Sequence, residues 1–175
     1  MLLKDGELTI RNATEEDCSL LAKWWNDGKV MTHAGFPKGL GTTVEKIQED
    51  LKKDSDIAGR RLIIENNNRP IGEMYYKNLG DYTADIGIKI CEIDQQEKGY
   101  GKILLTMFIK ELFAIGYEKI VLDTNFQNKR AQHVYEELGF EKVRINIDSW
   151  TDQLGNKQSS VDYRLNKGQL ISFIK

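Results

Sequence analysis

The stretch Gln95-Gln96-Glu97-Lys98-Gly99-Tyr100-Gly101 decides the fold, because the hydrophobic period of the chain changes on either side of it. Before it, residues 83–91 alternate between an apolar and a second face, which is typical of a β-strand. After it, apolar residues recur at helical spacing from Ile103 to Ile115, and Gly116 ends the predicted helix. The two glycines therefore lie at the junction between a strand and a helix.

A glycine-rich junction of this kind is suited to binding a phosphate. Gly99 and Gly101 leave the backbone open to a ligand, and the first amides of a helix have no partner within it. The helix dipole adds about half a positive charge, and Lys98 and Lys102 bring cations. The spacing of neither the dinucleotide fingerprint nor the nucleotide P-loop is met. A tight turn that uses glycine only for its geometry is the alternative.

Short strands and amphipathic helices alternate along the rest of the chain. Thr14 with Asp17 and Thr42 with Glu45 have capping-box spacing and predict two helices, the first with Trp25 on its buried face. A Gly/Pro-rich stretch over 35–41 predicts a mobile loop. Strands are predicted near residues 8–11, 61–64, 70–76, 83–90, 119–124, 140–147 and 161–165. This order predicts one α/β domain over residues 1–175, a mixed, mostly antiparallel sheet of about seven strands with about four helices on its faces.

Composition excludes several classes of protein. The 175 residues are 40% hydrophobic and 30% charged, which excludes a disordered chain. A net charge of −2 argues against a nucleic-acid partner, and no apolar run reaches the about 20 residues that cross a bilayer. With no signal-peptide pattern, we expect a cytoplasmic protein without a membrane partner. Cys18, Cys91, His33 and His133 lie too far apart to predict a metal site or a disulfide.

A second motif, Asn128-x-x-Ala131-x-x-x-Tyr135-x-x-x-Gly139-Phe140, follows the predicted strand 119–124, and Asn128 is predicted to cap its helix. Residues 96–101 also match the form (Gln/Arg)-x-x-Gly-x-(Gly/Ala). In this order and among these elements, the two motifs resemble the GNAT superfamily of N-acetyltransferases, over nearly the whole chain. Residues 21–27 and 150–156 are similar to the branch of ribosomal-protein, spermidine and some aminoglycoside acetyltransferases.

The resemblance implies acetyl transfer from acetyl-CoA to a primary amine. The backbone of Cys91 and Ile93 would pair with the pantetheine arm, and Asn128 would hydrogen-bond to the cofactor or to an ordered water. Tyr135 would contact the cofactor and face the thioester sulfur as general acid. The resemblance assigns the CoA diphosphate to Gln96, Glu97, Lys98, Gly99, Tyr100, Gly101 and Lys102.

The chemistry requires a proton acceptor and a proton donor. At a pKa of about 10.4, neutralising an amine at pH 7 costs about 4.6 kcal/mol, so a base or a water chain must take its proton. Asp85 is the first candidate base and Glu73 the second, while a water chain and an ordinary ion-paired role for either carboxylate stay open. A phenol of pKa about 10 is matched to protonate a thiolate of pKa about 8.5, which suits Tyr135 as acid. A backbone N–H near Cys91 or Ile93 would stabilise the oxyanion.

The acceptor is less well defined, and a small-molecule amine and a protein N-terminus both stay open. An acidic stretch favours a cationic small molecule, and aromatic residues either line the acceptor pocket or pack in the core. A non-catalytic acyl-CoA-binding module and a generic phosphate-binding protein are the alternative functions, and a homodimer is compatible with the resemblance. The acidic residues are Glu45, Glu49, Asp50, Asp54 and Asp56, and the aromatic ones Tyr75, Tyr76, Trp24, Trp25 and Phe36.

Overall fold

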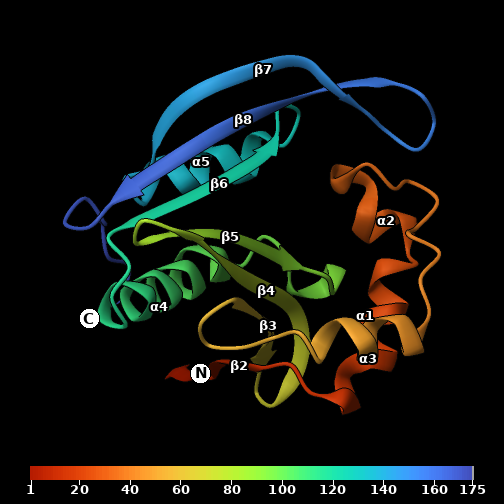
Figure 1. Ribbon diagram of the computed structural model, residues 1–175, viewed down its shortest axis with the longest axis horizontal. Coiled ribbons are helices and arrows are strands. Elements are labelled where there is room, and N and C mark those ends of the chain that lie inside the picture. Colours follow the sequence, from red (N-terminus) through yellow and green to blue (C-terminus); the bar gives the residue numbers. More distant parts are fainter. Residues whose placement is uncertain (175) are drawn as a thin grey trace.

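One eight-stranded sheet forms the centre of the molecule (Figure 1). The computed structural model of the chain describes residues 1–174. The strands lie in the order β1-β2-β3-β4-β5-β6-β8-β7. All neighbouring strands run antiparallel except β5 and β6, which are parallel. Their bounds are β1 Leu2–Asp5, β2 Leu8–Asn12, β3 Gly59–Asn66, β4 Arg69–Gly80, β5 Thr83–Ile90, β6 Lys119–Asn125, β7 Glu141–Thr151 and β8 Lys157–Asn166.

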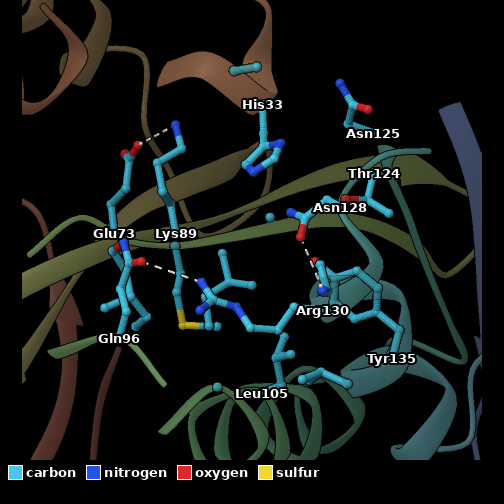
Figure 2. Close-up of a pocket in the computed structure, with 18 of the residues that line it drawn as sticks. His33, Glu73, Lys89, Gln96, Leu105, Thr124, Asn125, Asn128, Arg130 and Tyr135 are labelled. Carbon is cyan, nitrogen blue, oxygen red and sulfur yellow. Dashed lines mark hydrogen bonds and ion pairs between the residues drawn. The ribbon is translucent and has the colours of Figure 1, made fainter. Parts of the chain in front are cut away.

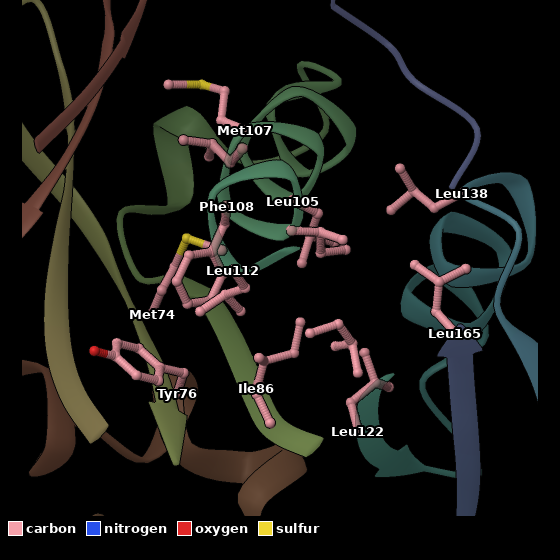
Figure 3. Packing of buried hydrophobic residues seen from close by; sticks show 14 of the residues in the cluster. Met74, Tyr76, Ile86, Leu105, Met107, Phe108, Leu112, Leu122, Leu138 and Leu165 are labelled. Carbon is pink, nitrogen blue, oxygen red and sulfur yellow. The ribbon is translucent and has the colours of Figure 1, made fainter. Parts of the chain in front are cut away.

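Helices cover both faces of this sheet. On one face, α4 and α5 pack over the larger apolar cluster, which contains Phe108 and Ile86 (Figure 3). On the other face, α1 and α3 pack over Ile63 and Cys91. The helices are α1 Cys18–Trp25, α2 Gly28–Met31, α3 Val44–Leu51, α4 Tyr100–Ala114 and α5 Lys129–Glu137, with 3-10 turns η1 Glu15–Asp17, η2 Thr32–Ala34 and η3 Ile93–Gln95. No helix within residues 1–174 has the length and apolar character needed to cross a bilayer.

The sheet divides between β5 and β6. These strands are paired only from Thr83 with Lys119 to Asp85 with Val121, and beyond that point their register ends. Because β5 continues to Ile90 and β6 to Asn125, the two strands diverge toward the start of α4. Backbone groups on the facing edges of this opening therefore have no neighbouring strand to pair with.

The mixed α/β sheet is confirmed, with one more strand and one more helix than predicted from the sequence. The extra strand is β1, which pairs with β2 from Leu2 with Arg11 to Asp5 with Leu8. Its few exposed residues carry no strong alternation, so the pattern did not indicate it. The extra helix is the short α2, which follows Asp27, whose side chain accepts from the Lys29 amide.

Several local predictions need correction. Thr43 caps α3 in place of Thr42, whose amide instead donates to Asn26 Oδ1 at 2.8 Å. Trp24 rather than Trp25 is fully buried in α1, and Ile115, predicted to face the core, is 50% exposed past the end of α4. The capping pair Thr14–Asp17 forms as predicted, but it starts the 3-10 turn η1 before α1.

Candidate active site

The glycine loop presents a row of unpaired amides. Among residues 1–174, no atom accepts from the main-chain N–H groups of residues 97–102, which run into the first turn of α4. Gly99 is left-handed, with φ of +79°, and Glu97 takes a similar conformation at +60°. Gly101 has no such requirement, and a Cβ added there would meet nothing within 4 Å. Neither packing nor φ explains glycine at 101, whereas close approach of a ligand to the amides does.

Two cations stand beside these amides. Arg130, from α5, reaches across the loop and donates to Glu97 at 2.8 Å and to Gln96 at 3.4 Å (Figure 2). Lys98 has no carboxylate within 4 Å among residues 1–174. Lys102 differs, because its Nζ lies 2.5 Å from Glu137 and above the Phe173 ring. The loop fits a diphosphate, which Lys98 and Arg130 can approach as charges.

Strand β5 turns the backbone of Ile88 and Ile90 toward the opening, where the Ile90 carbonyl accepts from Gln96 Nε2 at 2.9 Å. The Cys91 N–H donates to the Ile71 carbonyl of β4 at 2.9 Å, so by the alternation of a strand the backbone of Ile90 faces the opening toward β6. The Cys91 amide is therefore not free for a pantetheine arm, contrary to the expectation from the resemblance. Ile93 lies in η3 with 67% of its surface exposed, and neither residue lines the cleft.

A cleft of about 700 Å³ joins the glycine loop to the opening of the sheet. Tyr135 lines it from α5, with its ring 5.8 Å from that of Phe140 and 5.6 Å from that of Tyr163. Its hydroxyl has no partner among residues 1–174 and is not among the buried polar atoms that lack one, so it reaches the cleft. Burial, with a smaller effect of the Asp123 carboxylate, raises the pKa of Tyr135 to about 12. The phenol is therefore protonated at neutral pH.

Asn128 lies beside Tyr135 and has a structural role as well. Its Oδ1 accepts from the Ala131 amide at 3.2 Å, which confirms it as the cap of α5. Asn128 also lines the cleft, near the opening between β5 and β6 (Figure 2). The structure thus brings Tyr135, Asn128 and residues 96–102 of the predicted site together around one cleft.

The two predicted base candidates lie in different surroundings. Asp85 does not line the main cleft but a second depression of about 320 Å³, and burial followed by the Asp123 charge raises its pKa. Glu73 lines the cleft, but it is only 4% exposed and accepts from Trp25 Nε1 and Arg61 Nη1, both at 2.7 Å. Such a carboxylate is fixed in ion pairing rather than free to take a proton.

Asp123 is a carboxylate that the sequence did not single out. It follows the divergence of β5 and β6 and lines both the cleft and the smaller depression. Desolvation, followed by the neighbouring Asp162 charge, raises the pKa of Asp123 although its side chain reaches solvent. No cation lies within 4 Å of it among residues 1–174. The parallel register that places Asp123 after the divergence is not visible in the sequence alone.

Two segments that are distant in the sequence meet near the cleft, at the predicted mobile loop. Gly35 lies against the Trp150 ring, and a Cβ there would come within 2.4 Å of it. The Gln153 amide donates to the Gly35 carbonyl at 2.8 Å, and its side chain bonds to the Lys38 amide and the Gly39 carbonyl. We refer to this contact between residues 35–39 and 150–153 as the latch. Three hydrogen bonds of Gln153 therefore connect the predicted mobile loop to the β7–β8 hairpin.

Most of the residues considered for the acceptor end do not line the cleft. Of the five aromatic candidates only Tyr75 lines the cleft, while Tyr76 packs in the core against Phe108. None of the five acidic residues from Glu45 to Asp56 lines it, and Asp50 is instead paired with Lys46 and Lys53. Of the two histidines, His133 is exposed beside Glu137, whereas His33 contributes to the cleft wall.

The family model described as an acetyltransferase (GNAT) domain matches residues 7–141. The chain belongs to the GNAT acetyltransferase family. The match includes the glycine loop and the helix of Tyr135, the parts that form the cleft. A curated relative, the uncharacterised protein MJ1062 of Methanocaldococcus jannaschii, is 26% identical over 142 residues. That alignment covers 81% of this chain but only 29% of the relative, so the chain spans less than a third of its length.

Solved structures share the GNAT fold over most of the chain. A spermidine N-acetyltransferase from Vibrio cholerae, in complex with CoA and spermine, has a TM-score of 0.84 at 22% identity, covering 94% of this chain and 98% of that one. A dodecameric structure of the Vibrio cholerae enzyme has a TM-score of 0.77 at 23% identity, with 93% and 95% covered. The structure of yncA, a putative acetyltransferase from Salmonella typhimurium with its cofactor acetyl-CoA, has a TM-score of 0.76 at 19% identity, with 92% of this chain and 94% of that one covered.

Proposed function

We propose that this GNAT protein transfers an acetyl group from acetyl-CoA to the primary amine of a small molecule. The observation that carries the proposal is the meeting of two features in one cleft. One is the row of free amides at residues 97–102, and the other is the unpartnered hydroxyl of Tyr135. Solved neighbours that contain CoA or acetyl-CoA support the choice of cofactor.

The residues that would hold the cofactor follow from the loop and the opening of the sheet. Amides 97–102, with Lys98 and Arg130, would bind the diphosphate, and Asn128 would lie beside the arm that enters the cleft. The pantetheine arm would pair with the backbone of Ile88 and with the Ile90 amide, in place of Cys91 and Ile93. Acetyl-CoA supplies a thioester, whose acyl carbon accepts the amine and whose thiolate then leaves.

The proton transfers use two side chains of this protein. The amine nitrogen forms a bond to the acyl carbon as the bond to sulfur breaks. Its proton passes to a carboxylate or through water, and Tyr135 gives its own proton to the thiolate. Because Asp123 faces the cleft without a cation partner, it is better placed than Asp85 to take the amine proton. Bulk water restores the proton of Tyr135.

Turnover of acetyl-CoA over a panel of amines, followed by thiol release, tests the proposal. Tyr135→Phe should lower kcat by about 10²- to 10⁴-fold, the usual contribution of a general acid, and leave the affinity for acetyl-CoA unchanged. Tyr117→Phe is the matched control, since Tyr117 is also a buried tyrosine but packs against Tyr76. Binding of acetyl-CoA without turnover on any amine would indicate a non-catalytic binding module instead.

A further inference from the structure

The acceptor end of the cleft carries an excess of partly buried positive charge. Glu73, only 4% exposed, is held by Arg61 Nη1 at 2.7 Å and lies 3.7 Å from Lys89 Nζ. The side chains of Arg61 and Lys89 are 29% and 28% exposed. Two cations thus share one carboxylate in a half-buried cluster. One positive charge remains uncompensated there, which is costly away from water unless an anion joins it.

Lys89 is the cation with the weaker partners. Besides Glu73, its Nζ contacts the Met31 sulfur at 3.0 Å, which is a weak acceptor. Figure 2 shows this ammonium beside Glu73, whereas the His33 ring lies between Lys89 and Asn125, on the turn η2 that contacts β6. Lys29 lines the same wall from α2 and has no carboxylate within 4 Å among residues 1–174. Lys89 and Lys29 therefore bring two ammonium groups to the cleft.

The opposite wall has the reverse character. Asp123 lines it from β6, together with the polar side chains of Thr124 and Asn125. Tyr75 lies between the two walls, with Arg61 5.6 Å from its ring centre and with the ring directly over Gly87. The close approach of this ring explains the glycine, because a Cβ at 87 would come within 2.2 Å of it. The acceptor end is thus positive on one side of Tyr75 and negative on the other.

We propose that the acceptor is a small amine that also carries an anionic group, either a carboxylate or a phosphate. Its ammonium lies toward Asp123 before transfer, and its anionic group binds Lys89 and Lys29. This inference rests on the proposed acetyl transfer. A polyamine such as spermidine suits the cleft poorly, because it lacks a group for the cationic wall and because the acidic stretch of α3 lies outside the cleft.

Two matched pairs of amines test the inference. The members of each pair differ in the anionic group and have it away from the amine, so that the nucleophile changes little. They are 4-amino-1-butanol with 4-aminobutyrate, and glucosamine with glucosamine 6-phosphate; spermidine is a fifth compound. The measured quantities are kcat/KM by thiol release and, by calorimetry, Kd of each amine for the protein–CoA complex.

We expect kcat/KM of the anionic member of at least one pair to exceed that of its neutral partner at least tenfold, and this preference should fall as the salt concentration rises. Which pair responds separates carboxylate from phosphate.

Lys29→Gln and Lys89→Gln give the residue-level arm of the test. Either change should reduce the ratio of kcat/KM for the anionic member to that for the neutral member about tenfold. Lys23→Gln is the control, since Lys23 is an exposed lysine of α1 that does not line the cleft. If kcat/KM falls equally for both members of a pair in these variants, the inference is overturned. The lysines would then support the structure of the cleft and would not bind the anionic group.

Failure of the inference and failure of the proposed function give different results. Fastest transfer to spermidine or to the neutral amines overturns the anionic acceptor and leaves acetyl transfer intact. If an anionic amine binds the CoA complex more tightly than its neutral partner but no compound releases thiol, the inference about the pocket is supported and the proposed acetyl transfer is contradicted. Equal binding of the anionic and neutral members in both pairs, with or without turnover, contradicts the inference.

Discussion

At the scale of single residues, Gly101 is a position where we expect a substitution to affect the stability of the fold and the binding of a ligand in opposite directions. It lies in the first turn of α4, without a left-handed φ and with open space where a Cβ would be. Gly101→Ala should therefore stabilise the helix by about 0.4–1 kcal/mol and raise Tm by a few degrees. The same methyl group would stand among the free amides of residues 97–102, so the affinity for CoA should fall at least tenfold. Thermal unfolding and calorimetry measure the two effects.

The combination of higher stability and weaker binding distinguishes this prediction from ordinary damage to the fold. Lys110→Ala is a suitable control, because Lys110 is exposed on the same helix and does not line the cleft. If Gly101→Ala leaves the affinity for CoA unchanged, the amides of this turn do not contact the diphosphate, and glycine at 101 has no role in binding.

Asp123 and Asp85 provide a second residue-scale prediction, from the pH dependence of kcat/KM. A base must be deprotonated to act, so kcat/KM should rise with pH through a carboxylate pKa that lies above its ordinary value, as desolvation makes it for Asp123. Asp123→Asn should remove this rise of kcat/KM at acidic pH, which we call the acid limb, and lower kcat/KM about 10²-fold. The second rise, which comes from deprotonation of the amine substrate near its own pKa of about 10, should remain. The profile is measured from pH 4 to about 10.

Asp85→Asn is the matched control for this experiment, since Asp85 shares the smaller depression with Asp123 but does not line the cleft. It should keep the acid limb. Loss of the limb in Asp85→Asn alone would return the role of base to Asp85, and its persistence in both variants would favour a water chain without a single base.

These residues show how much of the site the sequence could predict. The glycine loop, Asn128 and Tyr135 belong to two short motifs whose spacing fixes their place on helices, and all of them line the cleft. Asp123, Lys29 and Trp150 come from segments that meet only through the register of β5 with β6 and through the latch. No local pattern records such pairings. For the same reason Cys91 was expected to have a free amide that in fact bonds to β4.

At the scale of elements, the latch joins the β7–β8 hairpin to the loop that follows α2. Gln153 makes three of its bonds, one from the main chain and two from the side chain to Lys38 and Gly39. Gln153→Ala removes the side-chain bonds and should cost about 1–2 kcal/mol of stability. Because Ala34 and Trp150, next to the latch residues, line the cleft, KM for the amine should rise several-fold while the affinity for acetyl-CoA stays constant.

Hydrogen exchange and kinetics measure the two consequences of opening the latch. Lys157→Ala on the same hairpin is the control, as it is exposed and makes none of these bonds. Faster exchange at Lys38 and Gly39 without any change in the amine KM would show that the latch stabilises the fold but does not shape the acceptor end. The sequence marked residues 35–41 as a loop, yet its attachment depends on a hairpin more than a hundred residues away.

At the scale of the whole molecule, the divergence of β5 from β6 leaves a gap in an otherwise continuous sheet. Only three residue pairs join these strands, so about half of the backbone on each facing edge has no strand partner. The remaining strand pairs and the large apolar cluster hold the two parts of the sheet together. A ligand that pairs with β5 should therefore complete the sheet and stabilise the native state.

Amide exchange with and without CoA tests this role of the ligand. The Ile88 and Ile90 amides should exchange quickly in the free protein and at least tenfold more slowly with CoA bound, whereas the Cys91 amide, already bonded to Ile71, should be protected in both. At a concentration of about 100 times Kd, CoA should add about 2.7 kcal/mol of stability, or a rise in Tm of roughly 5–11 °C for a chain of this size. Unchanged exchange at Ile88 and Ile90 when CoA is bound would mean that the arm does not pair with β5, and the proposed path of the cofactor through the sheet would then be incorrect.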